Sequence, residues 1–272
     1  MYHKIRWTSE KIAQRLSLVQ ALVYRQQKTL PPFRYLRLES PATEPPIAPN
    51  MDDGDWQQIE WGMQWGEPDL DFILSSRFQI PLDWGTEAPL ALYLPIGEAG
   101  DFSHPEAQVY IDGQPYAACD RHHQEILLPP ECHNGDPHSL ALHGWTGGTQ
   151  RLRFDASGEA RPASDGGLIM RPCKVAQIDQ GTRDLIALAR VALGVADRLH
   201  DDEPERAHLY NALDEAFRVL DTREPFGERF YASVPHAHEV LRQGIDHSGA
   251  PLDVDITAVG HAHIDVALSL IH

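Results

Sequence analysis

The sequence predicts a mainly β protein with helices, in which an antiparallel β-sandwich lies between a helical N-terminal segment and a helical C-terminal segment. Short apolar segments recur between residues 72 and 178 and are separated by Pro, Gly and Asp, which is typical of antiparallel strands. Apolar residues before 28 and after 180 recur at helical spacing instead. With 42% hydrophobic residues in 272, the chain can form a large core or two domains.

Residues 1–50 are predicted to form one helix and a Pro-rich connector. The Thr-Ser-Glu sequence at 8–10 can start a helix, and apolar residues at helical spacing extend it to about Lys28. Two prolines at 31–32 end it. The segment 41–49 is expected to be extended, because Pro fixes φ and biases the preceding residue away from the helix.

Residues 51–180 are predicted to form the β-sandwich. The most specific local signal is Asp112-Gly113, because these residue types accept the positive φ angles of a two-residue hairpin turn. The predicted strands are 72–74, 90–94, 108–111, 125–128, 139–142, 152–154 and 174–178.

Residues 181–250 are predicted to form a helical linker. Helices are expected at 185–199 and 209–220, and a third at about 227–243 that Pro235 interrupts.

Residues 251–272 contain an apolar run followed by His261-Ala-His263-Ile-Asp265. In a strand these three polar side chains project to one side. Imidazole and carboxylate suit Zn²⁺, which normally takes three or four protein ligands, so the pattern indicates an incomplete metal site. The alternative is an exposed polar terminus.

Composition argues against several classes of function. The net charge of −17 disfavours binding to nucleic acid or to anionic membranes, and a neutral polyol substrate fits better. Three scattered cysteines do not resemble a disulfide framework, which favours a reducing compartment. The N-terminus lacks the apolar core of a signal peptide, and no segment approaches a membrane span in length. These features predict a cytoplasmic protein.

Two stretches resemble the glycoside hydrolase family 38 α-mannosidases, in the branch with an extra N-terminal β domain. The first is HPEAQVYIDGQPYAACDRHHQEI at 104–126, continuing to LALHGWTG at 140–147. The second, AVGHAHIDVA at 258–267, resembles the first catalytic strand of the family. The resemblance extends over most of the chain, and it implies a zinc-dependent retaining exo-α-mannosidase that hydrolyses terminal α-mannosides.

The resemblance also implies roles for residues near the end of the chain. His263 and Asp265 match zinc ligands, and His261 would lie nearby without binding the metal. Residues 251–272 would be the first strand of an incomplete α/β barrel. The family continues after the equivalent of Ala267 with an aromatic residue, usually Trp, whereas this chain reads Leu268. A truncation or frameshift would explain that difference. The nucleophile, the acid/base and the other zinc ligands would then be missing, which leaves an inactive fragment.

Two alternatives remain open at this level. Amidohydrolase-type barrels also begin with His-x-His at the end of their first strand. The sandwich could instead act alone, as a non-catalytic carbohydrate-binding module or as a subunit interface in a homo-oligomer.

Other polar clusters have structural explanations that we prefer. A second zinc site could be drawn from Cys and His residues, but their spacings are not those of a zinc finger. The polar residues near the fourth predicted strand are better explained as an edge that faces the missing barrel. The zinc candidates are Cys119, His122, His123, Cys132 and His133, and the polar edge is Arg121, His122, His123 and Glu125.

The remaining candidates for a functional role are the tryptophans, one Gly-rich segment and two acidic runs. Sugars stack on Trp, but core or interface anchoring is the preferred reading here. The Gly-rich segment 144–148 lacks the Lys of a phosphate loop and is predicted to be a turn after a strand ending near His143. The acidic runs 52–53 and 201–203 are expected to be solvated. The tryptophans in question are Trp56, Trp61, Trp65, Trp84 and Trp145.

Overall fold

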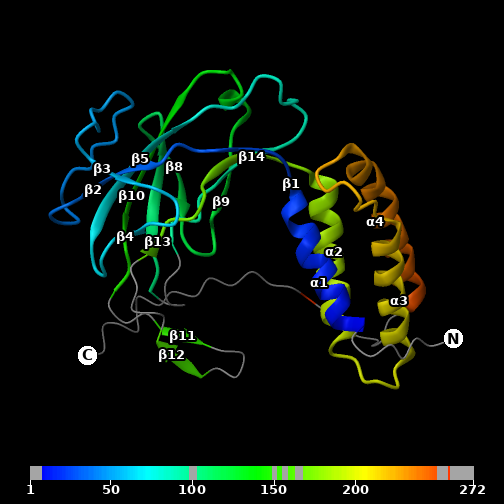
Figure 1. The fold of residues 1–272 in the computed structure, drawn as a ribbon. Helices are drawn as coiled ribbons and strands as arrows, with labels where there is room; N and C mark the ends of the chain where they lie inside the picture. The colour runs from blue at the N-terminus through cyan, green and yellow to red at the C-terminus, as the bar shows by residue number, and fades with distance from the viewer. Residues whose placement is uncertain are drawn as a thin grey trace.

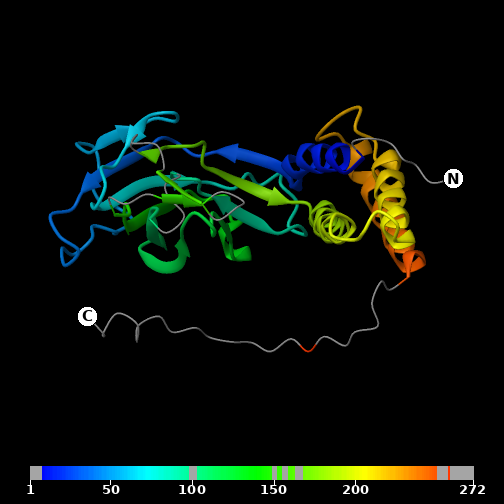
Figure 2. The ribbon, with the colours of Figure 1, turned by 90° about the horizontal axis from the view of Figure 1, so that it is seen from below.

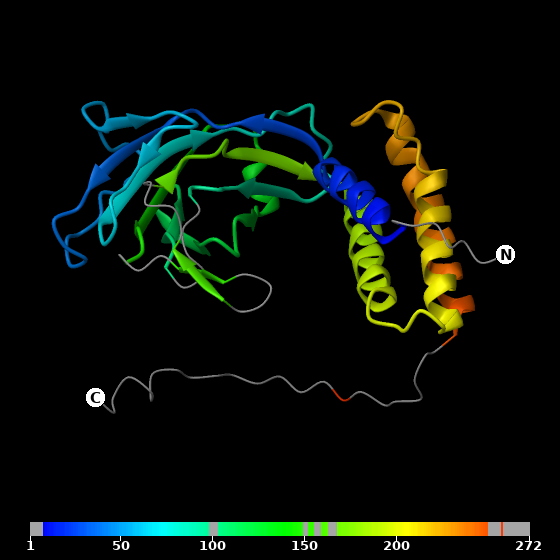
Figure 3. The same ribbon diagram turned by 60° about the horizontal axis from the view of Figure 1, so that its bottom comes forward.

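The computed structural model describes residues 8–97, 103–148, 152–154, 159–162, 168–249 and 257. Two β-sheets face each other, and a group of helices lies at one end of them (Figures 1, 2 and 3). The fold class predicted from the sequence, an antiparallel sandwich with helices, is therefore confirmed.

Every paired strand in the two sheets is antiparallel to its neighbour. The four-stranded sheet has the order β1 (Tyr24–Thr29), β14 (Lys174–Ile178), β6 (Leu90–Tyr93) and β9 (Glu125–Leu127). The six-stranded sheet has the order β3 (Gln57–Ile59), β2 (Phe33–Arg37), β5 (Asp71–Phe78), β10 (His138–Trp145), β7 (Glu106–Ile111) and β8 (Gln114–Cys119). Two short pairs join β4 (Gln64–Trp65) to β13 (Leu168–Ile169) and β11 (Leu152–Phe154) to β12 (Ala160–Pro162).

The core of the sandwich follows from the alternation of side chains along its strands. Leu90 and Leu92 of β6 and Val175 of β14 belong to the same buried cluster as Phe72 and Leu74 of β5. Successive residues on each strand point to opposite faces, so the other face of each sheet remains for contacts outside the sandwich.

The predicted hairpin and the predicted extended connector meet in the structure. Asp112 and Gly113 have φ values of 50° and 76°, which confirms the two-residue turn between β7 and β8. A Cβ atom at Gly113 would lie 3.0 Å from a ring carbon of Pro49, so the connector passes directly over this turn. Further along, the Asp53 carboxylate accepts a hydrogen bond from Ser75 Oγ at 2.7 Å, which places Asp53 against β5.

The helices form a second buried cluster, the helical core. The elements are α1 (Thr8–Gln20), the 3₁₀ turn η1 (Ala21–Val23), α2 (Gln180–Ala196), α3 (Pro204–Val219) and α4 (Glu228–Ser248), and a further 3₁₀ turn η2 (Pro130–Cys132) lies in the sandwich. Asp179 caps α2, because its carboxylate accepts hydrogen bonds from Thr182 N at 2.8 Å and Thr182 Oγ1 at 2.6 Å. Ala91 and Ile178 belong to the helical core, so the helices pack against the outer face at one end of the four-stranded sheet (Figure 1).

Two helix predictions need correction. The N-terminal helix ends at Gln20, and the residues up to Thr29 form η1 and β1 instead of continuing the helix to Lys28. With β2, two strands therefore precede residue 51. The third C-terminal helix is not interrupted at Pro235, because α4 runs through it to Ser248.

The predicted barrel strand at 251–272 lies outside the described residues, apart from Thr257, which is exposed and in no regular element. Among the helices that the structure describes, none combines the length and the apolar character needed to cross a bilayer.

Candidate functional site

The predicted zinc ligands His263 and Asp265, and the neighbouring His261, lie outside the described residues. Within the described ranges, no group of three or more His, Cys, Asp and Glu side chains is arranged to hold a metal ion. The structure therefore leaves the predicted metal site as a prediction. A polar site among the described residues lies elsewhere, where the sandwich meets the helices.

This junction is centred on Glu125 of β9. Both of its carboxylate oxygens contact Arg183 Nη2 of α2, at 2.8 and 2.7 Å, and Tyr24 Oη of β1 donates to Glu125 Oε2 at 2.8 Å. Glu125 is placed there by the register of the sheet, since it pairs with Tyr93 and therefore lies on the same outer face. The contact joins residues 58 positions apart in sequence and ties two layers together.

A lysine and two tyrosines extend the junction across the outer face of the sheet. The Tyr24 and Tyr93 ring centroids are 5.6 Å apart, and Lys174 Nζ lies 4.5 Å from the Tyr24 centroid. Lys174 Nζ also donates to Gln27 Oε1 at 2.8 Å. Together Lys174 and the two tyrosines form a cation–π cluster, and Gln27 adds a polar contact beside it.

Burial changes the acid–base properties of this cluster. Burial, followed by the hydrogen bond to Glu125, raises the pKa of the Tyr24 hydroxyl above its usual value. Burial lowers the pKa of the Lys174 ammonium group. Tyr24 therefore remains a neutral phenol that donates to a carboxylate, and its partner oxygens are already engaged. These contacts hold the four-stranded sheet and α2 together and do not form an acid–base pair.

Replacing Arg183 with alanine is expected to lower the free energy of unfolding by about 1–2 kcal/mol, because half-buried Glu125 loses its charged partner. The two side chains are 31% and 27% exposed, so solvent screens part of the effect. Urea unfolding followed by circular dichroism measures the change. Arg190→Ala, at an exposed position of the same helix, is the matched control and should change the free energy by less than about 0.5 kcal/mol. Equal losses in both variants would contradict a stabilising role for the junction.

The residues of the predicted polar edge are separated in the structure. Glu125 contacts α2 of the same chain instead of remaining free for a further domain. His122 and His123 lie on an exposed turn, where their backbone N–H groups donate to Asp120 Oδ1 at 2.6 and 2.7 Å. Arg121 is half-buried in the same turn.

The alternative zinc set is also dispersed. Cys119 is 1% exposed and points into the sandwich core, whereas His122 and His123 lie on the exposed turn. Cys132 is buried in η2, and His133 Nε2 lies 3.1 Å from the Pro81 carbonyl oxygen. Burial raises the pKa of the Cys119 thiol to about 12, so it remains protonated and is a poor metal ligand at neutral pH.

The tryptophans divide into core and surface residues. Trp65 and Trp84 are buried at 5% and 7% exposure, which excludes them as stacking platforms in the folded protein. Trp61 and Trp145 are exposed at 41% and 37%, and Trp56 is half-buried. Trp145 Nε1 donates to Asp69 Oδ1 at 3.0 Å, so its ring is held in place at the surface.

The strand before the Gly-rich segment is longer than predicted. β10 continues beyond His143 to Trp145, and Gly144 pairs with Phe72 of β5 and Ala107 of β7. The turn itself follows at Gly147, which has a φ of 86°. Residues 144–145 therefore belong to the sheet and residues 146–148 follow it, so this segment is not a phosphate-binding loop.

Sequence reasoning missed Tyr24, Tyr93, Lys174 and Arg183. The sequence pattern places Tyr24 in a helix, whereas it lies in β1, and Arg183 precedes the predicted start of its helix at 185. The one usable signal was the alternation at 174–178, which places Lys174 on the face opposite Val175.

Comparisons with known proteins give limited similarity. The sequence matches no family model, and the comparison with curated proteins finds no similar sequence. Among solved structures, a β-glucuronidase from Faecalibacterium prausnitzii aligns over 56% of this chain and 31% of its own, with 10% identity and a TM-score of 0.39. A β-glucuronidase from Ruminococcus gnavus, in complex with an N1-substituted uronic isofagomine, aligns over 56% and 30%, with 9% identity and a TM-score of 0.37.

These solved structures are glycoside hydrolases, and the chain spans less than a third of the length of either. Superpositions of this quality do not establish a shared activity.

Proposed function

We propose that these 272 residues are the N-terminal portion of a zinc-dependent retaining exo-α-mannosidase. The observation that carries the proposal is the segment 258–267, AVGHAHIDVA, which resembles the first catalytic strand of family 38 mannosidases. The order of elements supports it, because a β-sandwich and a helical layer precede this segment, as the resemblance implies.

The donor set fits zinc in type but not in number. His263 and Asp265 offer an imidazole and a carboxylate, which Zn²⁺ accepts, but a stable site needs three or four ligands. Within the described part of the chain no group of three or more His, Cys, Asp and Glu side chains is arranged to hold a metal ion. When bound, the ion would orient and polarise sugar hydroxyls. In this proposal His263 and Asp265 hold it, and His261 lies beside it without binding.

Zinc titration followed by calorimetry tests the ligand assignment. The chain is expected to bind Zn²⁺ weakly, and His263→Ala should weaken binding by about tenfold, because it removes one of two ligands. His261→Ala is the matched control, since it removes an imidazole only two residues away, and it should bind within about twofold of the original chain. If His261→Ala weakened binding as much as His263→Ala, the assignment would be wrong.

Hydrolysis of 4-nitrophenyl α-mannoside, measured with and without added zinc, tests the activity. We expect no turnover by the 272-residue chain and zinc-dependent turnover by a longer protein that supplies the remaining barrel segments. Turnover by the 272 residues themselves, or a longer protein that cleaves cyclic amides and not mannosides, would contradict the proposal. Saturable binding of methyl α-mannoside to the 272 residues would favour a carbohydrate-binding sandwich instead.

A further inference from the structure

Strand β1 lies at one edge of the four-stranded sheet, and within the described residues its only strand partner is β14. Leu30 N donates to the Cys173 carbonyl oxygen at 2.9 Å, so the backbone groups of Leu30 face β14. Because these groups alternate along an antiparallel strand, Lys28 also faces β14, whereas the N–H and C=O groups of Gln27 and Thr29 point to the free edge. Residues 26–29 are exposed, so this edge is accessible.

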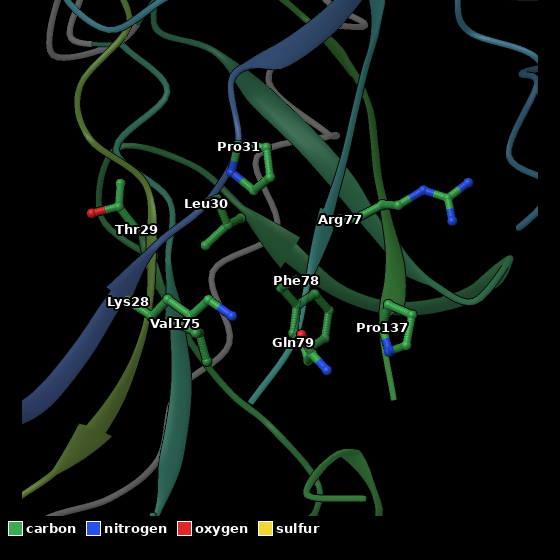
Figure 4. Close-up of a pocket in the computed structure, with 9 residues that line it drawn as sticks. All are labelled: Lys28, Thr29, Leu30, Pro31, Arg77, Phe78, Gln79, Pro137 and Val175. Atoms are coloured by element: carbon green, nitrogen blue, oxygen red, sulfur yellow. The ribbon is translucent and has the colours of Figure 1, made fainter. Parts of the chain in front are cut away.

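Two cavities open along the same strand. The first, of about 230 Å³, has Leu30, Phe78 and Val175 in its lining and Lys28 beside them. Figure 4 shows the Lys28 side chain extending over this cavity and that of Arg77 pointing away from it. The second, of about 290 Å³, includes Gln26 in its lining. Gln26 and Lys28 are two residues apart, so their side chains lie on the same face of β1, and one cavity adjoins each of them.

Positive charge lies on both sides of this edge. Lys28 accompanies the first cavity, and Lys174 lies on the outer face, 2.8 Å from Gln27 Oε1. Arg25 is already paired with Glu228, and Glu87 lines the second cavity, so the unbalanced charge is at the Lys28 end. This local positive charge favours an acidic peptide segment at the edge, although the protein as a whole carries a net charge of −17.

We propose that the edge of β1 binds an extended acidic peptide segment of another protein as an added strand, with alternate aliphatic side chains entering the two cavities. Main-chain hydrogen bonds would come from Gln27 and Thr29, and the cavities would select side chains. A lysine on an edge strand by itself discourages pairing, but here aligned cavities accompany it. A second copy fits less well, because antiparallel self-pairing of Gln27 with Thr29 puts Lys28 opposite Lys28.

Fluorescence anisotropy with a labelled, capped Val-Glu-Val-Glu-Val-Glu peptide tests the proposal. In this peptide valines face the cavities and glutamates face Lys174. Gln27→Pro removes the N–H that points to the free edge and leaves the hydrogen bonds to β14 in place, so peptide binding should weaken by about tenfold. Gln27→Ala removes the side chain but keeps the N–H, and it should bind within about twofold of the original protein.

Further measurements separate the effect of charge on peptide binding from any loss of folding in the variants. The matching Val-Lys peptide should bind at least about tenfold more weakly, and raising the salt concentration should reduce that difference. Lys28→Glu, at an exposed position, should weaken binding of the Val-Glu peptide even if Gln27→Pro lowers the melting temperature. No saturable binding of that peptide below about 1 mM overturns the proposal, as does equal affinity of Gln27→Pro and Gln27→Ala. A dimer in sedimentation that Gln27→Pro abolishes would assign the edge to a second copy instead.

Discussion

Replacing Trp65 with alanine is expected to lower the free energy of unfolding by about 3–5 kcal/mol. The Trp65 ring packs edge-on against Phe72, with centroids 5.0 Å apart, and against Tyr35 at 5.9 Å. Its indole N–H donates to the Ile96 carbonyl oxygen at 2.7 Å. The substitution leaves a cavity in the sandwich core and removes the donor from a buried carbonyl, and both effects are destabilising.

Urea unfolding followed by tryptophan fluorescence and circular dichroism measures this loss. Trp61→Ala is the matched control, because Trp61 is 41% exposed whereas Trp65 is 5% exposed. The control should change the free energy of unfolding by less than about 0.5 kcal/mol. Similar losses for the two variants would mean that burial does not distinguish these tryptophans as the structure describes.

Replacing Gly144 with alanine is expected to destabilise the six-stranded sheet by about 3 kcal/mol or more. A Cβ atom at this position would lie 2.1 Å from the Glu106 carbonyl oxygen and 2.8 Å from Ala107 Cβ. Gly144 pairs with Ala107, so these atoms cannot move away without separating β10 from β7. A collision with backbone atoms is harder to relieve than one with a flexible side chain.

Gly148→Ala is the matched control for this prediction. A Cβ atom at Gly148 would meet its nearest neighbour, Ser103 Oγ, at 3.6 Å, which is ordinary contact. Thermal unfolding followed by circular dichroism should therefore show a large decrease in melting temperature for Gly144→Ala and little change for Gly148→Ala. Retention of the original melting temperature by Gly144→Ala would show that the sheet can open at this point.

The strands that could be predicted from sequence carry their own local pattern. Residues 174–178 alternate inward and outward side chains, and β14 has these bounds. Asp112-Gly113 predicted its turn because few residue types accept positive φ at both positions. The wrong assignment at Tyr24–Thr29 has the opposite origin. The Arg, Gln and Lys residues of this segment have high helix propensity, but pairing with β14 outweighs that preference.

The candidate site could be predicted only in part for a related reason. The sequence places Glu125 at the start of a predicted strand, but its partner Arg183 lies on a helix whose position relative to the sheet is not encoded in any local pattern. Burial of Trp65 and Trp84 likewise depends on which sheet faces which. The proposed zinc ligands rest on a short motif, and motif spacing specifies donor types without fixing the rest of the coordination shell.

The position of α1 has a consequence for synthesis of the chain. Its side chains Ile12, Leu16 and Val19 share the helical core with Leu241, and Tyr231 Oη donates to the Leu22 carbonyl oxygen across 209 residues. On a ribosome adding about 5–20 residues per second, the first helix therefore waits about 10–45 s before α4 emerges. During that interval its apolar stripe has nothing from α4 to cover it, so a chaperone that shields nascent chains has a defined segment to hold.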